Sequence, residues 1–577
     1  MELTALLRGP LRGHRGRLAL LVVLQLLQAS ALLYLPTLNA DIINNGVLTG
    51  DTGHIVRVGA VMVAVTVLQV VCLAGAVRLG AYIALSVGRD LRELTFTRVL
   101  DLSATELARL GTPSLITRSV NDVQQIQTFL LTGLTMLVAA PVMGVGGVLL
   151  ALGQDVPLAL LLLVMVPLIG VLMLAIVRRL RPLQRVVQRC ADTMNRVLRE
   201  QVGGVRVIRA FNRDGYERQR FAAVNEELTG IGVRSGRLST MMLPLAATVT
   251  NLFCVPVVWL GAYRVDAGQM QIGALTAFLG YLSLILVGII SATFALMSLP
   301  RAEASAERVA EVLRTRTSLT PPAEPVTVLP RPGHLELRDV EYRLPGAEEP
   351  MLRGVDLVAR PGETTAVVGS TGSGKSTLLA LVARLADVAA GQVLVGGVDV
   401  RELDRSALSR AVALVPQQAW LFAGTVASNL RFGRPDAADA ELWRALETAQ
   451  ARDFVEAMDR GLDSEVTQGG GNFSGGQRQR LAIARALVAR PGIYLFDDSF
   501  SALDHATEMR LRAALATEIA EATVVTVSQR VAAIRHAERI VVLEAGVVAG
   551  VGTHDELLAD NAVYREIVQS QLTEELA

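Results

Sequence analysis

A glycine-rich stretch in the second half of the chain has the residue types and spacing that bind phosphate. It consists of Gly369, Ser370, Thr371, Gly372, Ser373, Gly374, Lys375, Ser376 and Thr377. An apolar strand-like run precedes it and a helical pattern follows, which is the context that a phosphate-binding loop requires. Backbone N–H groups would point at phosphate oxygens, Lys375 would reach the terminal phosphates and the Ser376 hydroxyl would bind Mg²⁺. The stretch therefore predicts a nucleotide site rather than a chance glycine-rich turn.

Lys375 is the only lysine among the 55 basic residues of the chain. A genome biased toward arginine codons accounts for the excess of arginine, but it does not account for the position of the one lysine. A compact ammonium on a flexible stem fits among phosphate oxygens where a planar guanidinium does not. The position of the lysine supports the phosphate-binding interpretation.

Two acidic residues, Asp497 and Asp498, end the apolar run 493–496. A carboxylate that follows a strand beside a phosphate loop is placed to hold Mg²⁺. We therefore expect Asp497 to share a magnesium ion with Ser376.

A second anion-binding turn lies in the stretch 473–480, directly before the helical pattern 481–488. Its first residue would cap the helix and the amides that follow would bind an anion; the turn consists of Ser474, Gly475, Gly476 and Gln477. One nucleotide has one terminal phosphate, so two such sites in a domain indicate that two domains face each other. Each would close the nucleotide of the other.

The elements around these motifs alternate between strand and helix. Strand-like runs at 365–369, 493–496 and 523–527 are separated by helical segments and predict an α/β fold with a mostly parallel sheet. A cluster of prolines between residues 321 and 332 predicts a linker before this soluble part. The expected domains are a six-helix transmembrane domain at 1–300, a linker at 301–333 and a nucleotide-binding domain at 334–577.

The first part of the chain is typical of a membrane protein. The whole chain is 51% hydrophobic and 19% charged, with a mean hydropathy of +0.43. A helix needs about 20 apolar residues to cross a bilayer, and the stretches that meet this need are 18–40, 58–80, 130–152, 156–177, 241–263 and 272–297. The formal net charge of +1 gives no overall positive potential that would attract nucleic acid, which disfavours a nucleic-acid-binding protein.

Arginine is distributed unevenly around these spans. Residues 1–17 contain four arginines and 178–237 contain fourteen, whereas the loop 44–54 contains none. Because basic residues favour the cytoplasmic side, the amino terminus and the two long loops are predicted to be cytoplasmic. A cleaved signal peptide is the alternative for the first span, and it is disfavoured because the run is long and lacks a small-x-small cleavage site.

The two long loops, 89–128 and 178–240, have helical periodicity, so we expect the membrane helices to continue into water. Ordinary surface helices fit the same pattern. Residues 111–113 and 203–204 interrupt the loops, and helical hairpins would turn there. No Asp, Glu, Lys or Arg lies in the middle of a predicted span, so energy for any transport must come from the soluble part.

Through these motifs and its membrane spans, the chain resembles the ATP-binding cassette (ABC) exporters over nearly its whole length. It specifically resembles a half-transporter with one membrane domain and one nucleotide-binding domain. The turn at Ser474 resembles the family's signature sequence. Residues 415–417 resemble the Q-loop, with Gln417 at the magnesium and coupling position, and 501–504 resemble the D-loop, with Ser501 and Asp504. Residues 205–211 resemble part of the second intracellular loop of exporters.

The resemblance implies ATP and Mg²⁺ as cofactors, with Ser376, Gln417 and Asp497 as metal ligands, and ATP hydrolysis coupled to transport. It implies a second half-transporter as partner, with which the chain closes on two ATP molecules and then opens outward. It also implies contact with membrane lipid and a small-molecule substrate. The protein would lie in a bacterial plasma membrane, with its nucleotide-binding domain in the cytoplasm.

Four positions depart from the family pattern. Asp498 stands where the family usually has a glutamate that polarises the attacking water, and Gln529 stands at the switch histidine. An aspartate is one methylene shorter, and a displacement of about 1 Å costs on the order of a hundredfold in rate. Gln468 replaces a common glutamate, and Leu344 replaces the aromatic residue that stacks on adenine, with Tyr342 as a substitute. For Gln468 and Leu344, neutral drift is the alternative explanation.

Asp498 and Gln529 belong to one composite site, so we interpret their joint change as a single specialisation. The phosphate loop of this chain would bind ATP but hydrolyse it slowly. A homodimer would have two impaired sites, whereas in a heterodimer the partner supplies glutamate and histidine. The heterodimer is the favoured hypothesis.

The leading functional prediction is ATP-driven export of amphipathic small molecules, drugs or lipids. The alternatives are an importer with exporter-like architecture, for example for a siderophore, and a lipid flippase. A soluble-type cassette in regulation or DNA repair, with the apolar half as an anchor, is disfavoured because the sequence has no basic nucleic-acid stripe.

Overall fold

The computed structural model describes residues 2–344 and 346–576, which form two compact units. The helical unit consists of Met1–Leu100 and Thr112–Arg314, and the sheet unit consists of Asp101–Gly111 and Thr315–Ala577. Asp101–Gly111 lies inside the expected membrane domain but packs with the sheet unit, and the last helix of the helical unit continues into the expected linker as far as Arg314.

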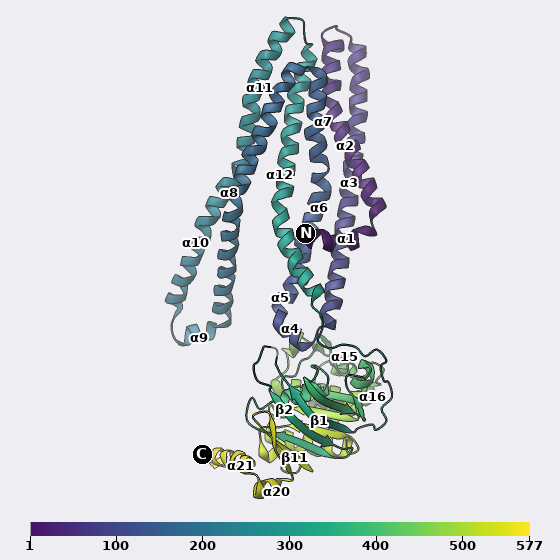
Figure 1. Ribbon diagram of the computed structural model, residues 1–577, viewed down its shortest axis with the longest axis vertical. Helices are drawn as coiled ribbons and strands as arrows, with labels where there is room; N and C mark the ends of the chain where they lie inside the picture. The colour runs from purple at the N-terminus through teal and green to yellow at the C-terminus, as the bar shows by residue number, and fades with distance from the viewer. Residues whose placement is uncertain (1, 345, 577) are drawn as a thin grey trace. The chain divides into compact units, whose positions relative to one another are not determined.

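The helical unit contains six long apolar segments (Figure 1). Among the described residues, the segments long and apolar enough to cross a membrane are Arg15–Val47, Thr52–Asp101, Thr112–Gln154, Val156–Gly203, Asp214–Asp266 and Ile272–Arg314. Each contains one of the predicted spans, so the six-span prediction is confirmed. The helices are α1 (Glu2–Arg12), α2 (Arg15–Ile42), α3 (Thr52–Asp101), α5 (Thr112–Thr117), α6 (Val123–Thr132), α7 (Ala139–Gln154), α8 (Val156–Gly203), α9 (Val205–Ala210), α10 (Asp214–Thr240), α11 (Met242–Asp266) and α12 (Ile272–Arg314), with π-helical turns η1 (Ile43–Val47), η2 (Arg118–Asp122) and η3 (Gly133–Leu137).

Several helices are far longer than a bilayer requires. α3 has 50 residues and α8 has 48; at about 1.5 Å per residue each is roughly 70 Å long or more, against roughly 30 Å of hydrocarbon. The prediction that the membrane helices continue beyond their spans is therefore confirmed. The predicted interruptions are also present: Gly111 has a φ of 76° and follows α4 (Ala104–Leu110), and α8 ends at Gly203.

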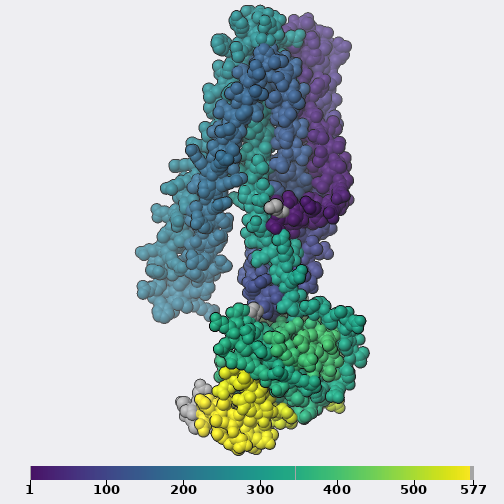
Figure 2. Space-filling model, viewed as in Figure 1, coloured from purple at the N-terminus to yellow at the C-terminus, as the bar shows by residue number. Residues whose placement is uncertain are grey.

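α8, α9 and α10 form an arm that stands apart from the rest of the helical unit. α8 and α10 run side by side to the short helix α9 (Figure 1). Figure 2 shows open space between the end of this arm and α12. The tip carries apolar side chains in water: Val202 is 74% exposed, Val207 61% and Phe211 73%.

A buried carboxylate joins η2 to α12 within the helical unit. Asp122 is 3% exposed. Its oxygens accept hydrogen bonds from Arg308 Nε at 2.7 Å and from Ser305 Oγ at 3.0 Å. A buried charge is stable only with such partners, so this contact fixes where α12 passes η2.

We predict that Asp122→Ala destabilises the helical unit by about 1–3 kcal/mol, because it removes charge-assisted hydrogen bonds from a buried position. The measurement is thermal unfolding of the purified protein in detergent. The control is Asp90→Ala, which removes the partner of the largely exposed Arg89 and should cost less than about 1 kcal/mol. Equal losses in the two variants would contradict this account.

The sheet unit is built on a six-stranded sheet with the order β12-β11-β3-β10-β9-β6. All neighbours pair in parallel except β11 and β12, which are antiparallel. The predicted α/β fold is confirmed, and the three predicted strands are β3, β9 and β10. A four-stranded antiparallel sheet, β2-β1-β4-β5, and a small pair, β7-β8, complete the strands.

The strands are β1 (Leu335–Tyr342), β2 (Leu352–Ala359), β3 (Thr364–Val368), β4 (Ala390–Val395), β5 (Val398–Asp399), β6 (Val412–Val415), β7 (Gly424–Thr425), β8 (Glu465–Val466), β9 (Ile493–Asp497), β10 (Thr523–Val527), β11 (Arg539–Glu544) and β12 (Val547–Gly552). The α-helices, besides α4, are α13 (Lys375–Val382), α14 (Arg405–Ala411), α15 (Val426–Arg431), α16 (Asp439–Thr448), α17 (Arg452–Glu456), α18 (Gly475–Ala489), α19 (His505–Glu518), α20 (His554–Asp560) and α21 (Ala562–Leu576). Short 3₁₀ turns are η4 (Gly461–Asp463), η5 (Gln468–Gly470) and η6 (Val531–Ala533).

The parallel sheet determines where the motif residues meet. β3, β6, β9 and β10 are neighbours in the sheet and point in one direction, so their carboxyl ends lie at one edge. The phosphate loop follows β3, Gln417 follows β6, Asp497 ends β9 and Gln529 follows β10. Ligand sites of parallel α/β folds lie at this edge.

α4 is held in the sheet unit by polar contacts. Ser103 and Glu106 form a capping box at its amino end, in which Glu106 accepts from the Ser103 N–H at 2.9 Å. Ser318, just after the start of the second segment of this unit, donates to Ser103 Oγ at 3.0 Å. These bonds tie α4 to the chain segment that leads into the sheet.

Candidate nucleotide-binding site

The loop between β3 and α13 has a path that only glycine permits. Gly374 has a φ of 98°, and a Cβ there would lie 2.6 Å from a methyl group of Leu352. A Cβ at Gly369 would lie 2.0 Å from the carbonyl oxygen of Leu543. Because Gly374 has no side chain to cap α13, the N–H groups of the first helical turn are left to bind an anion.

Lys375 lies at the centre of this loop and is 7% exposed. Its ammonium donates to the carbonyl oxygens of Gly369 at 2.8 Å and Ser370 at 2.7 Å. Burial lowers the pKa of Lys375, and the charges of Asp497 and Asp498 oppose this shift. Two neutral carbonyls do not balance a buried cation, so the site favours an anionic ligand.

Ser373 provides a second sign that the loop fits a phosphate. It is 3% exposed, and within the described part of the chain its Oγ has no hydrogen-bond partner. A buried hydroxyl without a partner costs free energy unless a ligand or water supplies one. The loop therefore has a buried cation, helix N–H groups and a free hydroxyl that all suit phosphate oxygens.

Ser376 and Asp497 are in direct contact. Ser376 Oγ donates to Asp497 Oδ1 at 2.9 Å. Burial raises the pKa of Asp497, and the hydrogen bond from Ser376 opposes this shift. A hydroxyl and a carboxylate beside phosphate oxygens form the hard oxygen ligand set that Mg²⁺ prefers, so these residues fit the metal.

Asp498 lies beside Asp497 and faces Gln417. Gln417 Nε2 donates to Asp498 Oδ2 at 3.3 Å. Burial raises the pKa of Asp498, while hydrogen bonds from Ser501 and Gln417 lower it. Its backbone has a φ of 45°, a left-handed conformation that aspartate tolerates better than most residues. The structure thus brings together the predicted residues Lys375, Ser376, Gln417, Asp497 and Asp498.

Gln529 follows β10 and is exposed beside this group. The Asp498 N–H donates to the Val527 carbonyl at 3.0 Å, which joins the ends of β9 and β10. The Gln529 N–H also favours the ionised form of Asp498 and so lowers its pKa. The two departures from the family pattern are therefore neighbours in space, as the sequence interpretation requires.

The signature turn is preformed at the start of α18. Ser474 Oγ accepts from the Gln477 N–H at 3.2 Å, and Gln477 Oε1 accepts from the Ser474 N–H at 2.9 Å. This capping box satisfies two backbone donors at the helix start. The turn follows α17 and η5 in the chain, whereas the phosphate loop follows β3.

Ser501 and Asp504 lie between β9 and α19. Ser501 Oγ donates to the Asp498 carbonyl at 2.7 Å, so it supports the backbone of Asp498. Asp504 caps α19 by accepting from the Thr507 N–H at 3.0 Å, and this bond lowers the pKa of Asp504. Ser501 therefore contacts the site, and Asp504 stabilises the start of α19.

Tyr342 and Leu344 differ in exposure. Tyr342 is 8% exposed and packs in the core under the four-stranded sheet, whereas Leu344 is 43% exposed. Stacking of the Tyr342 ring on adenine stays a prediction. Gln468 begins the turn η5.

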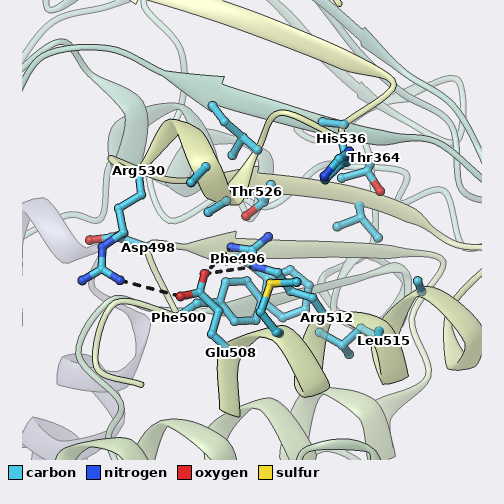
Figure 3. A pocket seen from close by; sticks show the side chains of 18 of the residues that line it. Thr364, Phe496, Asp498, Phe500, Glu508, Arg512, Leu515, Thr526, Arg530 and His536 are labelled. Atoms are coloured by element: carbon cyan, nitrogen blue, oxygen red, sulfur yellow. Dashed lines mark hydrogen bonds and ion pairs between the residues drawn. The ribbon is translucent and has the colours of Figure 1, made fainter. Parts of the chain in front are cut away.

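A cavity beside Asp498 contains charged residues that the sequence interpretation missed. It occupies about 1120 Å³ between α19 and the sheet (Figure 3). Glu508, 5% exposed, lies in it between two arginines, 3.0 Å from Arg512 and 3.7 Å from Arg530. Glu508 and Arg512 have the i,i+4 spacing of a helical ion pair, but Arg530 lies on a separate segment, so only the fold reveals that it joins them.

Comparisons with known proteins agree with this architecture. Residues 18–290 match the model of the ABC transporter transmembrane region, and residues 352–501 match the ABC transporter model. An uncharacterized ABC transporter ATP-binding protein of Mycobacterium tuberculosis is 48% identical over 99% of this chain and 98% of its own length. The chain belongs to the ABC transporter family. As a member of this family, it is an integral membrane protein that binds ATP and couples ATP hydrolysis to transport.

Two further comparisons concern exporters. A multidrug efflux ATP-binding/permease protein of Mycobacterium tuberculosis is 34% identical over 97% of this chain and 47% of its own length. The structure of a bacterial Atm1-family ABC exporter with ATP bound superposes with a TM-score of 0.81, covering 97% of this chain and 98% of that chain at 23% identity. This ABC transporter therefore has the fold of an exporter half-transporter, and such halves generally dimerise.

We predict opposite effects of Asp497→Asn with and without Mg²⁺. Without Mg²⁺ near pH 7.5, the variant should unfold about 2–4 °C higher, because it removes a carboxylate whose ionisation burial disfavours. The difference should shrink as the pH falls, since a carboxyl with a raised pKa loses its contribution to stability as pH rises through that pKa. Stabilisation by Mg²⁺ and ATP should be largely lost in the variant.

The measurement is the melting temperature from pH 5 to 8, with Asp436→Asn, at an exposed position, as the control. In the wild type, Mg²⁺ should bind less tightly as the pH falls, because protons compete for the raised carboxyl. An unchanged response of Asp497→Asn to Mg²⁺ would show that Asp497 is not a metal ligand.

Proposed function

We propose that the chain is one half of a heterodimeric ABC exporter that moves amphipathic small molecules, drugs or lipids out of a bacterial cell. In this proposal residues 1–300 form the transmembrane domain, 301–333 a linker and 334–577 the cytoplasmic nucleotide-binding domain. The observation that carries the proposal is the contact group of Lys375, Ser376 and Asp497 in a chain that also has six membrane-spanning segments.

ATP would supply the free energy of hydrolysis, and Mg²⁺ would neutralise negative charge on its phosphates. Lys375 would balance the charge of the terminal phosphates, and Ser376, Gln417 and Asp497 would hold the metal. The N–H groups of 369–377 would orient the phosphates at the start of α13. Asp498 would hold the proton of an attacking water less effectively than a glutamate, because its carboxylate is one methylene shorter.

The need for a second half-transporter is supported by two incomplete surfaces. The turn at Ser474 offers the N–H groups of a helix start, and within residues 2–344 and 346–576 it makes no hydrogen bond to the phosphate loop 369–377. The arm of α8–α10 ends in exposed apolar residues, including Val207 and Phe211. An apolar tip in water indicates a surface that is covered by another domain.

The preference for a heterodimer is supported by the adjacency of Asp498 and Gln529. Both residues stand on neighbouring strands beside one phosphate loop, so both changes affect one site. Gln529 donates hydrogen bonds but has no cationic form, which weakens its attraction to a phosphate. A partner with glutamate and histidine at these positions would keep one efficient site, completed by the Ser474 turn of this chain.

Export of amphipathic molecules is supported by the apolar spans and by the likeness to the multidrug efflux protein. No acidic or basic side chain lies in the middle of a predicted span, so a cavity between the two halves would be largely apolar. The cytoplasmic placement of the nucleotide-binding domain is supported by the arginine-rich stretches 1–17 and 178–237.

We predict that Lys375→Ala abolishes ATP-dependent transport and weakens ATP binding by at least about a hundredfold, because a buried charge-assisted contact is lost. The measurement is uptake of a fluorescent amphipathic dye into inverted membrane vesicles that contain both halves, together with ATP binding. Arg405→Ala, at an exposed position at the start of α14, is the control. Unchanged transport in Lys375→Ala would overturn the proposed function.

We predict that Asp498→Glu combined with Gln529→His raises ATP hydrolysis at the site of this chain by about tenfold or more, since it restores a base and a cation. The measurement uses the two-half complex in which the glutamate of the partner's site is replaced by glutamine. Asp498→Asn in the same complex should change turnover little. Brisk hydrolysis by the unmodified chain alone would contradict the heterodimer.

A further inference from the structure

The C-terminal helix α21 packs on the sheet unit through one stripe of residues. Tyr564, Ile567, Val568 and Gln571 are spaced so that they share a helix face. Tyr564 is fully buried, and its hydroxyl lies 2.8 Å from His554 Nδ1. Ile567 and Val568 pack against the same apolar cluster. Gln571 is the polar end of an otherwise apolar stripe. The C-terminal part of the chain that carries this stripe is yellow in Figure 2.

Gln571 makes two hydrogen bonds to the backbone that follows β10. Its Oε1 accepts from the Val531 N–H at 2.7 Å, and its Nε2 donates to the Gln529 carbonyl at 2.5 Å. One side-chain amide therefore pairs with both residues that flank Arg530, as the backbone of a neighbouring strand would. This contact needs a donor and an acceptor on the same side chain.

The backbone of Gln529 is held from both sides by these contacts. Its N–H faces the Asp498 carboxylate, and its carbonyl accepts from Gln571. The cavity between α19 and the sheet borders the same segment, and several of its lining residues are alanines, among them Ala532 and Ala533. Figure 3 shows Asp498 and Arg530 at one end of this cavity. The segment thus has little bulky packing beneath it, which increases the importance of the Gln571 contact.

We infer that Gln571 is a positioning residue, which holds the Gln529 backbone so that the Gln529 side chain meets the terminal phosphate of ATP in the loop of this chain. The inference rests on the proposed role of Gln529. Gln571 touches no nucleotide in this arrangement and acts only through residues 529–531. The C-terminal helix, anchored by Tyr564, is thereby part of the nucleotide site.

The first test measures how fast the full-length protein in lipid nanodiscs releases radiolabelled ATP in the presence of Mg²⁺. Gln571→Ala should release ATP about fivefold to tenfold faster than the wild type, since the switch residue loses its hydrogen-bonded support. Glu566→Ala, at an exposed position on the same helix, is the control and should release ATP at the wild-type rate. An unchanged release rate in Gln571→Ala would overturn the inference.

The second test uses pH to separate positioning from a general packing role. In Gln571→Glu at pH 8, an ionised carboxylate would face the Gln529 carbonyl and release should be about as fast as in Gln571→Ala. A protonated glutamic acid has the same donor and acceptor as glutamine, so it can again donate to the Gln529 carbonyl and accept from the Val531 N–H. The ratio of release rates, variant to wild type, should therefore fall toward one as the pH decreases from 8 to 5.

A ratio that stays constant with pH would overturn the positioning role, because a packing defect does not titrate in this range. The two tests also separate this inference from the proposed function. A wild-type protein that retains no ATP would contradict the proposed function. Retention of ATP by the wild type with unaltered release in both Gln571 variants would contradict only the role of Gln571.

Discussion

The buried ammonium of Lys375 is the interaction on which the rest of the nucleotide site depends. It is held by two neutral carbonyl oxygens inside a loop whose glycines leave no room for side chains. An anion is needed to balance this charge, and the parallel sheet brings the metal-binding carboxylate and the switch segment to the same edge. ATP bound in this loop favours the closure of two domains only through the additional contacts that it makes with the second domain in the closed arrangement.

The same edge of the sheet explains why changes at Asp498 and Gln529 act together. β9 and β10 are hydrogen-bonded neighbours, and the two residues follow their carboxyl ends. The backbone of Asp498 bonds to the end of β10 and accepts from Ser501, so its position is set by the strand ends and not by the length of its side chain. In the proposed heterodimer, such a site would keep its nucleotide while hydrolysing it slowly.

Local signals in the sequence predicted most of the fold. The six spans follow from runs of apolar residues, and the strand–loop–helix order around Lys375 follows from glycine spacing. The contact of Ser376 with Asp497 joins residues 121 positions apart, yet it was expected because both follow strands of one parallel sheet. In contrast, Tyr342 lies in a core that forms only in the folded unit, and Gln571 bonds to a residue 42 positions away through a side chain with no motif around it. Ser103 and Glu106 have the spacing of a capping box, but the bond from Ser318 that ties α4 to the sheet unit joins residues 215 positions apart and has no sequence signal.

The exposed tip of the α8–α10 arm has a consequence for the life of the protein in the cell. Valine and aromatic side chains at Val202, Val207 and Phe211 face water in the isolated subunit. Quality-control proteases and chaperones act on such apolar surface, so an orphan copy would be removed while an assembled copy would be spared. In the proposed heterodimer, the cellular amount of this subunit would then follow the supply of its partner, and the two halves would stay in equal number without separate control of their synthesis.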